Sequence, residues 1–242
     1  MMRIIGVIPS RYASTRFPGK PLRLIKGKSL IRRVWEQSKK SRYLDDVIVA
    51  TDDKRIADEV RSFGGTVVMT SRNCKSGTDR LAEVAWKYER SAGIILNIQG
   101  DEPLIHPGLI DRIARELARD RRLMIATAVF PLKRQKDIDN PNIAKVVIDK
   151  DGFAVYFSRS PIPFNRGRGS VRYFKHIGIY GYRRDFLLKY AKWLQTPLEK
   201  AEKLEQLRVI ESGEKIMTVI ADKDSPGVDV PDDIRKIEKL IK

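Results

Sequence analysis

The sequence predicts an α/β protein with a mostly parallel, Rossmann-like sheet that is covered by helices on both faces. Two observations predict this fold. Short apolar runs alternate with amphipathic helical segments along most of the chain, as in proteins whose parallel strands are joined by helices. The chain has 242 residues, 42% of them hydrophobic, which is enough to fill the core of one such domain.

The apolar runs and the helical patterns follow each other in a regular order. Strands are expected at residues 4–8, 47–50, 66–69, 94–98, 124–129, 144–148, 176–182 and 216–220. Helices are expected at residues 30–40, 54–63, 80–88, 107–119, 185–193 and 197–211. We therefore expect a single domain, residues 1–242.

Four polar segments directly follow predicted strands. They read SRYASTRFPGK from residue 10, TDD from 51, TSRNCKSGTDR from 70 and QGDEP from 99. Ligands of parallel sheets bind beyond the carboxyl ends of the strands, so these four loops are expected to meet at one edge and form the site.

The first loop carries Arg11, Arg16 and Lys20 and is suited to holding phosphates. It lacks the spacing of a P-loop, because Gly19-Lys20 is followed by Pro21. It also lacks the three spaced glycines of a dinucleotide-binding turn. The loop is therefore expected to bind a nucleotide through backbone amides, small side chains and fixed cations.

The net charge of +17 is concentrated in two blocks. Residues 1–44 hold twelve Lys and Arg against one acid, and residues 159–184 hold seven against none. This distribution favours anionic ligands between the blocks, although a solvated helix face also explains the cations of residues 32–42. The Gly- and Arg-rich segment 164–173 is either a loop that orders on an anion or an ordinary hairpin tip.

Two carboxylates suit a magnesium ion. Asp101 follows a buried run and Gly100, and Asp229 lies in an apolar, proline-flanked segment instead of on a helix surface. Mg²⁺ takes one or two protein carboxylates and completes its shell with water and phosphate oxygens. For Asp101 a turn or helix-cap role is an equal alternative at this stage.

The segment 176–182 has a face suited to a ligand. Period-two alternation places His176, Gly178, Tyr180 and Tyr182 on one side of the strand, and the glycines are expected to leave room for a ligand. A buried core histidine is the plainer alternative. In the helical pattern at 197–211 the acids beside the apolar stripe, Glu205 among them, are ordinarily solvated.

The cysteine count and hydropathy point to a cytoplasmic protein. Cys74 is the single cysteine, and two histidines are too few for a zinc cluster. The first apolar run is too short for a signal-peptide core, and no run reaches the length of a membrane span. We expect no association with membranes.

Eight segments in order resemble the 3-deoxy-manno-octulosonate cytidylyltransferase family, known also as CMP-KDO synthetases, over almost the whole chain. They are IPSRYASTRFPGKPL, VATDD, SGTDRLAEV, NIQGDEPLI, NPNIAKVV, YFSRSPIPF, HIGIYGYR and LEKAEKLEQLR. The resemblance implies the nucleotide-diphospho-sugar transferase type of fold, with a small lobe near residues 155–190 that binds sugar and forms a homodimer.

The same resemblance implies a reaction and a set of site residues. CMP is transferred from CTP to the anomeric hydroxyl of the acid sugar KDO, with release of pyrophosphate, for lipopolysaccharide biosynthesis. Arg11 and Lys20 bind the triphosphate, and Asp101 and Asp229 bind Mg²⁺. The nucleotide lies against Ala13, Ser14, Thr15, Arg72, Ser76, Gly77, Thr78 and Gln99. The sugar lies against Gln99, Arg159, His176, Tyr180, Glu205 and Gln206, with Arg159 facing its carboxylate.

Two rival functions remain open from the sequence. A cytidylyltransferase for another acid sugar, such as a sialic acid or 8-amino-KDO, has the same loops. A nucleic-acid-binding protein fits the net charge of +17, but the chain has neither a recognition motif nor cations interleaved with aromatic residues. We expect no nucleic-acid partner.

Overall fold

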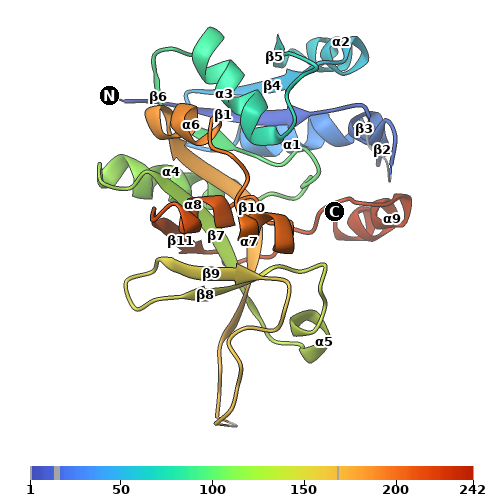
Figure 1. Cartoon of the computed structure of the whole chain (residues 1–242). Coiled ribbons are helices and arrows are strands. Elements are labelled where there is room, and N and C mark those ends of the chain that lie inside the picture. Colours follow the sequence, from blue (N-terminus) through green and yellow to red (C-terminus); the bar gives the residue numbers. More distant parts are fainter. Residues whose placement is uncertain (1, 14–16, 168, 242) are drawn as a thin grey trace.

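The computed structural model describes residues 2–13, 17–167 and 169–241, and it confirms the mostly parallel sheet (Figure 1). The strands of the main path lie in the order β11-β7-β10-β6-β1-β4-β5. All of these run parallel except β10, which is antiparallel to both of its neighbours. Their bounds are β1 Arg3–Ser10, β4 Asp46–Thr51, β5 Thr66–Met69, β6 Ala92–Asn97, β7 Ile125–Leu132, β10 Tyr173–Arg183 and β11 Ile216–Ile220.

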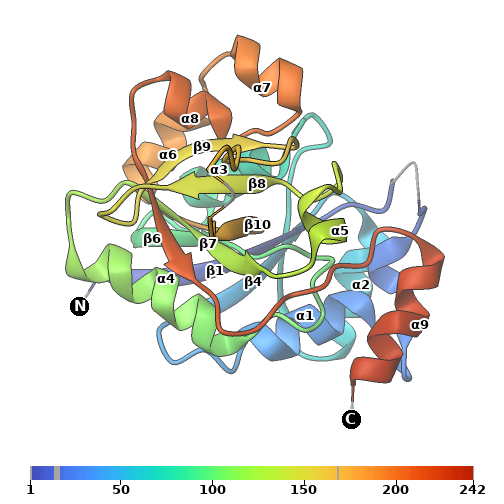
Figure 2. The same ribbon diagram turned by 90° about the horizontal axis from the view of Figure 1, so that it is seen from below.

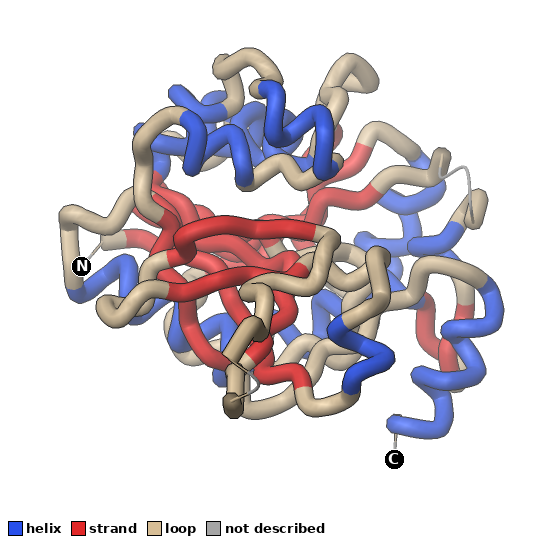
Figure 3. Tube along the Cα trace, turned by 60° about the horizontal axis from the view of Figure 1, so that its bottom comes forward, coloured by secondary structure: helices blue, strands red, loops and turns tan. Residues whose placement is uncertain are grey.

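Helices cover both faces of the sheet, as Figure 3 shows. One apolar core joins the sheet to α1 (Leu30–Ser38), α2 (Lys54–Ser62), α4 (Pro107–Arg119) and α9 (Pro231–Leu240). A second core on the opposite face joins it to α3 (Gly77–Lys87), α6 (Arg184–Tyr190) and α8 (Leu207–Glu211). The edge of the sheet between these two layers is left for ligands.

A small lobe extends from the sheet below β10 (Figure 1). It consists of β8 (Lys145–Ile148), which pairs with β10, and β9 (Ala154–Ser158), which pairs with β8. The chain between β9 and β10 forms a long arm at the far end of the molecule, and α5 (Gln135–Ile138) lies beside it. A two-stranded ribbon of β2 (Leu24–Ile25) and β3 (Lys28–Ser29) follows a short 3₁₀ helix, Lys20–Leu22.

The structure corrects the long helix expected at residues 197–211. It is two helices, α7 (Pro197–Glu202) and α8, because Lys203 takes a left-handed conformation with φ 54° and ψ 44°. The guanidinium of Arg159 donates to the carbonyl oxygens of Glu202 and Lys203 at 2.8 and 3.5 Å, which satisfies the end of α7. Because of this break, Glu205 and Gln206 lie in the connection between α7 and α8 and not on the surface of one continuous helix. Sequence patterns also missed β9 and α9.

A second correction concerns the glycines of β10. The alternation itself is confirmed, since Ile177 and Ile179 belong to one core and Tyr180 to the other. Gly178 leaves room for the side chain of Gln99, which a Cβ would meet at 3.4 Å. Gly181, however, permits the close approach of α4, because a Cβ there would lie 2.6 Å from Leu117. Only one of the two glycines serves the predicted site.

Candidate functional site

The carboxyl ends of β1 and β6 meet at a cavity of about 350 Å³, here called the loop cavity. Its walls come from the first loop, the start of α3 and the turn after β6. They are Pro9, Ser10, Arg11, Ala13, Lys20, Pro21, Gly77, Gln99, Gly100 and Asp101. Gly100 allows a close approach to β1 here, since a Cβ would lie 3.0 Å from the carbonyl oxygen of Pro9. The structure thus brings the first and fourth predicted loops together.

Lys20 and Asp101 form an ion pair in the loop cavity. Lys20 Nζ lies 2.7 Å from Asp101 Oδ2 and donates a second bond, of 2.8 Å, to the carbonyl oxygen of Val228. The backbone amide of Val228 donates to the carbonyl oxygen of Asp101 at 2.9 Å. The segment that carries Asp229 is therefore fixed beside Asp101, although the two residues are 128 positions apart.

Arg11 fixes the opposite wall of the loop cavity. Its guanidinium donates to the carbonyl oxygens of Cys74, Lys75 and Ser76 at 2.5 to 3.0 Å. Ser76 in turn caps α3, and its hydroxyl and the Asp79 carboxylate form a reciprocal capping box. The arginine thus holds the loop after β5 against the loop after β1. Its guanidinium also gives this wall of the loop cavity a fixed positive charge.

A smaller cavity of about 160 Å³, here called the tyrosine cavity, adjoins the first. The two share Gly77 and Gln99 as common walls. The remaining walls are Thr78, Asn97, Tyr180, Tyr182, Tyr190, Glu205 and Gln206. None of the described residues that line it is a Lys or Arg, so it suits the hydroxyl groups of a ligand more than its anionic end.

Three polar atoms of the tyrosine cavity are buried and have no hydrogen-bond partner within the described chain. They are Asn97 Oδ1, Glu205 Oε1 and Gln206 Nε2. Glu205 Oε1 has an ionic partner all the same, because Arg208 Nη2 lies 3.9 Å from it. Burial raises the pKa of the Glu205 carboxyl, while the hydroxyl of Thr78 and the charge of Arg208 act in the opposite direction. Unpaired buried polar groups cost about 1–3 kcal/mol each, so their presence on one cavity indicates a ligand that pairs with them.

His176 lies behind Tyr180. Its Nε2 is 2.9 Å from Thr127 Oγ1, and the rings of Phe157 and Tyr180 lie 5.2 and 5.3 Å away between centroids. The Thr127 hydroxyl donates its one proton to the carbonyl oxygen of Ile179 at 2.8 Å. Nε2 therefore carries the imidazole proton and donates to Thr127. Burial lowers the pKa of His176 to about 3, so the ring is neutral near pH 7.

This pKa predicts a loss of stability in acid. The unfolded chain binds a proton at His176 below about pH 6.5, whereas the folded chain does so only near pH 3. The free energy of unfolding should fall by about 1.4 kcal/mol for each pH unit below 6.5 because of this group. Urea unfolding of the wild type and of His176→Phe at pH 7 and pH 5 measures the difference. Equal pH dependence in the two proteins would contradict it.

The structure brings most of the predicted site residues to these two cavities, but not all. Arg72 is exposed in the loop after β5, and Arg159 donates to the backbone carbonyls of Pro141 and Glu202. Neither lines a cavity described above, and the same is true of Ser76, His176 and Asp229. Thr78 lies with the residues predicted for the sugar instead of with those predicted for the nucleotide. Ser14 and Thr15 lie outside the described residues.

Sequence reasoning missed Ser10, Asn97 and Tyr190, and it placed Tyr182 on the ligand-facing side of its strand without assigning it to the site. Asn97 and Ser10 carried a signal, since each is a polar residue that ends a buried strand, and both are at most 5% exposed. Tyr190 had none, because its place depends on how α6 packs against the sheet.

Residues of the loop cavity fit a divalent cation completed by a phosphate ligand. The Asp101 carboxylate already holds a cationic ammonium group at 2.7 Å and is one-third exposed. Among the described residues there is no cluster of three or more His, Cys, Asp or Glu side chains that would form a cage. Mg²⁺ takes one or two protein carboxylates together with water and phosphate oxygens. Of the described residues that line the loop cavity, Asp101 provides the one carboxylate.

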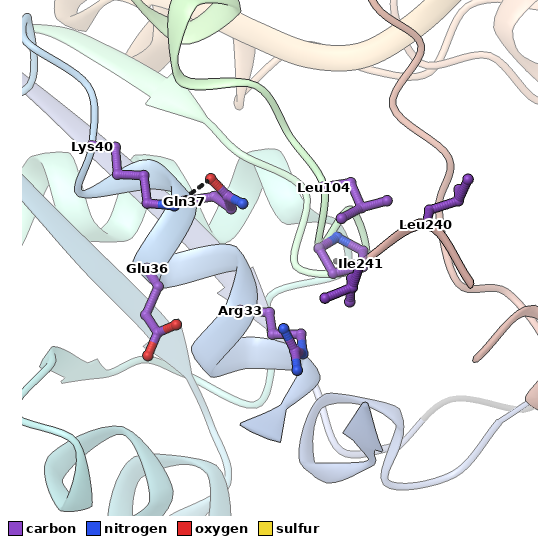
Figure 4. Close-up of a pocket in the computed structure, with 8 residues that line it drawn as sticks. Arg33, Glu36, Gln37, Lys40, Leu104, Leu240 and Ile241 are labelled. Atoms are coloured by element: carbon purple, nitrogen blue, oxygen red, sulfur yellow. Dashed lines mark hydrogen bonds between the residues drawn. The ribbon is translucent and has the colours of Figure 1, made fainter. Parts of the chain in front are cut away.

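A third hollow lies outside this site, between α1 and the C-terminal residues (Figure 4). Arg33 and Gln37 of α1 and Lys40, which follows the helix, form one wall, and Leu104 and Ile241 stand opposite. Arg33 donates to the carbonyl oxygens of the β2–β3 ribbon, and Lys40 to Gln37, so the cationic groups are engaged within the chain.

Comparisons with known proteins agree with this geometry. A family described as Cytidylyltransferase matches residues 5–216, and the chain belongs to this family of nucleotidyltransferases. Its relatives include proteins named 3-deoxy-manno-octulosonate cytidylyltransferase, and about half of their aligned residues are identical to those of this chain. The one from Fusobacterium nucleatum is 48% identical over 100% of this chain and 98% of its own, and that from Geobacter metallireducens is 49% identical over 99% and 98%. The resemblance stated from the sequence is confirmed.

Solved structures give the same result. A CMP:2-keto-3-deoxy-manno-octonic acid synthetase complexed with CTP superimposes with a TM-score of 0.95 at 42% identity, over 99% of this chain and 98% of the other. A 4-diphosphocytidyl-2C-methyl-D-erythritol synthase from Anaerococcus prevotii, at 13% identity and a TM-score of 0.64 over 99% and 96%, shares the fold alone. None of the helices in the described chain has the length and hydropathy to cross a membrane.

Proposed function

We propose that this enzyme transfers CMP from CTP to the anomeric hydroxyl of KDO and releases pyrophosphate. The observation that carries the proposal is the pair of adjoining cavities that share Gly77 and Gln99, one cationic and one rich in unpaired polar atoms. A triphosphate fits the first and a polyhydroxylated sugar the second. With the substrates bound in this way, the α-phosphate of one would lie beside the hydroxyl of the other at the common wall. The names of the close relatives support this pair of substrates.

The chain's own residues act by position and charge. The anomeric oxygen forms a bond to the α-phosphorus, the bond from that phosphorus to the pyrophosphate oxygen breaks, and the hydroxyl proton passes to water. Lys20 and Arg11 stabilise the charge that develops on the leaving pyrophosphate. Gln99, held by a 2.7 Å bond to the carbonyl oxygen of Gly178, orients the sugar at the boundary of the cavities. No covalent enzyme intermediate is needed.

We propose Mg²⁺ as the cofactor, held by Asp101 and Asp229. Support comes from the carboxylate of Asp101 in the loop cavity and from the segment of Asp229 bonded to it through Val228. When bound, such an ion neutralises phosphate charge and makes the attacking hydroxyl more acidic.

The direct test is pyrophosphate release from CTP and Mg²⁺ with KDO, 8-amino-KDO or N-acetylneuraminic acid, with an EDTA control. Release with KDO that EDTA abolishes is the expected result. Release with only one of the other two sugars would support cytidylyl transfer from CTP and would show that KDO is not the acceptor. If binding to DNA that falls with salt and ignores CTP were all that the protein showed, the nucleic-acid alternative would replace the proposal.

The sugar pocket makes a separate prediction at Gln206, which is 4% exposed and has an unpaired Nε2. Replacing it with Leu removes the donor, so the KM for KDO should rise about 10-fold or more while the KM for CTP stays within about 2-fold. Gln37→Leu, on α1 away from both cavities, is the matched control. A rise in the KM for CTP alone would contradict the placement of the sugar.

We further propose a cytoplasmic homodimer that contacts its partner through residues 155–190, the sugar-binding and dimerisation part of a single domain, and whose product serves lipopolysaccharide assembly. The arm carries Phe164 at 86% exposure, and Val155 of β9 is 52% exposed. Burial of such side chains is typical of subunit contacts. Phe164→Asp should weaken the dimer in sedimentation velocity, whereas Leu194→Asp, at an equally exposed site outside this region, should leave it intact. The opposite pattern would reject the arm as the interface.

A further inference from the structure

The chain between β11 and α9, residues 221–230, runs across the molecule from the sheet to the C-terminal helix (Figure 2). We call it the C-terminal strap. It starts where the amide of Ala221 donates to the carbonyl oxygen of Val129 at 2.8 Å, and it delivers Asp229 directly before α9. It contains no regular helix or strand, so its position depends on its contacts with the rest of the chain.

One of these contacts is a buried hydrogen bond between side chains. The hydroxyl of Ser225 donates to Glu102 Oε2 at 2.6 Å, and the two residues are 7% and 9% exposed. Glu102 is itself fixed, because its amide donates to the carbonyl oxygen of Gln99 and its own carbonyl accepts from the amide of Ile105. A bond this short between a hydroxyl and a carboxyl group is one of the stronger kinds of hydrogen bond, so it restrains both side chains.

The next contacts along the strap lie at the site itself. Three residues after Ser225, Val228 is fully buried and is bonded to Asp101 through its amide and to Lys20 through its carbonyl. Asp101 and Glu102 are neighbours, as are Val228 and Asp229. The Glu102–Ser225 bond therefore sets the register of the strap against the same turn that provides the first carboxylate.

The other anchors of the strap are less restrictive. Asp222 pairs with Arg112 at 2.9 Å but is 80% exposed, and Asp224, which pairs with Lys175, is 46% exposed. Exposed ion pairs contribute little to order, since solvent and salt compete for both groups. Of these three side-chain contacts, Glu102–Ser225 is the buried one, and the backbone bonds of Ala221 and Val228 are buried as well.

We propose that Glu102 is a positioning residue: through its bond to Ser225 it holds the strap in the register that places Asp229 beside Asp101 for the divalent cation. This rests on the proposed function in that the cation is the one assigned to Asp101 and Asp229. A purely structural role would make the same bond important for folding and leave metal binding unchanged.

The test measures binding of Mn²⁺ to the full chain without nucleotide, by the electron paramagnetic resonance signal of free Mn²⁺, together with thermal unfolding. Ser225→Ala should raise the dissociation constant for Mn²⁺ about 10-fold or more, the usual effect of losing a partner that orients a metal ligand. Glu102→Gln keeps an acceptor for the hydroxyl and should stay within about 3-fold of the wild type. Asp222→Asn removes an exposed anchor of the same strap and should leave the constant unchanged.

An unchanged Mn²⁺ constant in Ser225→Ala, with or without a lower unfolding temperature, would overturn the proposal. So would an equal rise in Asp222→Asn, since the effect would then be general to the strap. Failure of the proposed reaction is recognised separately, as absence of pyrophosphate release by the wild type, because the Mn²⁺ titration requires neither substrate.

Discussion

Asp101→Asn should lower turnover by about 10²-fold or more at saturating CTP, KDO and Mg²⁺. The substitution keeps the shape of the side chain and removes the charge that lies 2.7 Å from Lys20 Nζ at the loop cavity. A carboxylate at this place holds a cation against the phosphates, and an amide is a far weaker ligand. Single-turnover measurement of CMP-sugar formation at increasing Mg²⁺ separates the loss of metal affinity from the loss of rate.

The control is Asp58→Asn on α2, which removes a carboxylate of an exposed pair with Arg61. It should retain wild-type turnover. Near-normal turnover of Asp101→Asn at saturating Mg²⁺ would remove Asp101 from the catalytic residues and leave it a structural partner of Lys20.

Lys20→Met should have an effect of the same order, about 10²-fold or more in kcat, with a smaller change in the KM for KDO. Its side chain is 16% exposed, and its ammonium joins Asp101 to the backbone of Val228, so the charge is preorganised at the cavity in which we propose that the phosphates bind. Methionine fills a similar volume without the charge. The variant therefore tests charge stabilisation of the departing pyrophosphate.

Lys39→Met is the matched control, because Lys39 is 45% exposed and only 3.9 Å from Asp46. A kcat for Lys20→Met within a few-fold of the wild type would show that the triphosphate is stabilised elsewhere. If Lys20→Met lowered the unfolding temperature and left kcat nearly unchanged, the contacts of Lys20 with Asp101 and Val228 would be structural ones.

The sequence was sufficient for the parts of the site that follow from strand direction. The carboxyl ends of parallel strands share an edge, so the loops that carry Arg11, Lys20 and Asp101 had to lie on one side of the sheet. The packing of Tyr190 depends on tertiary contacts, which a local sequence pattern does not predict. The same is true of the buried atoms of Asn97 and Gln206 that lack a hydrogen-bond partner.

The break between α7 and α8 shows the same limit. The apolar spacing of residues 197–211 fits one helix, yet Arg159, 44 positions before Lys203, binds the carbonyls at its interruption. The strap is a further case. Asp229 was predicted as the second magnesium carboxylate beside Asp101, but sequence reasoning did not connect its segment with the contacts of Val228, Ser225 and Glu102 that hold it near Asp101.

The central claim is that CTP and the acid sugar occupy the two adjoining cavities. A crystal structure with CTP, Mg²⁺ and a KDO analogue that lacks the anomeric hydroxyl, the attacking group, tests it most directly. The account predicts the triphosphate between Arg11, Lys20 and Asp101, and the analogue against Asn97, Glu205 and Gln206, with its C2 facing the α-phosphorus past Gln99. A sugar bound outside the tyrosine cavity, or a triphosphate that does not contact Lys20, would contradict it.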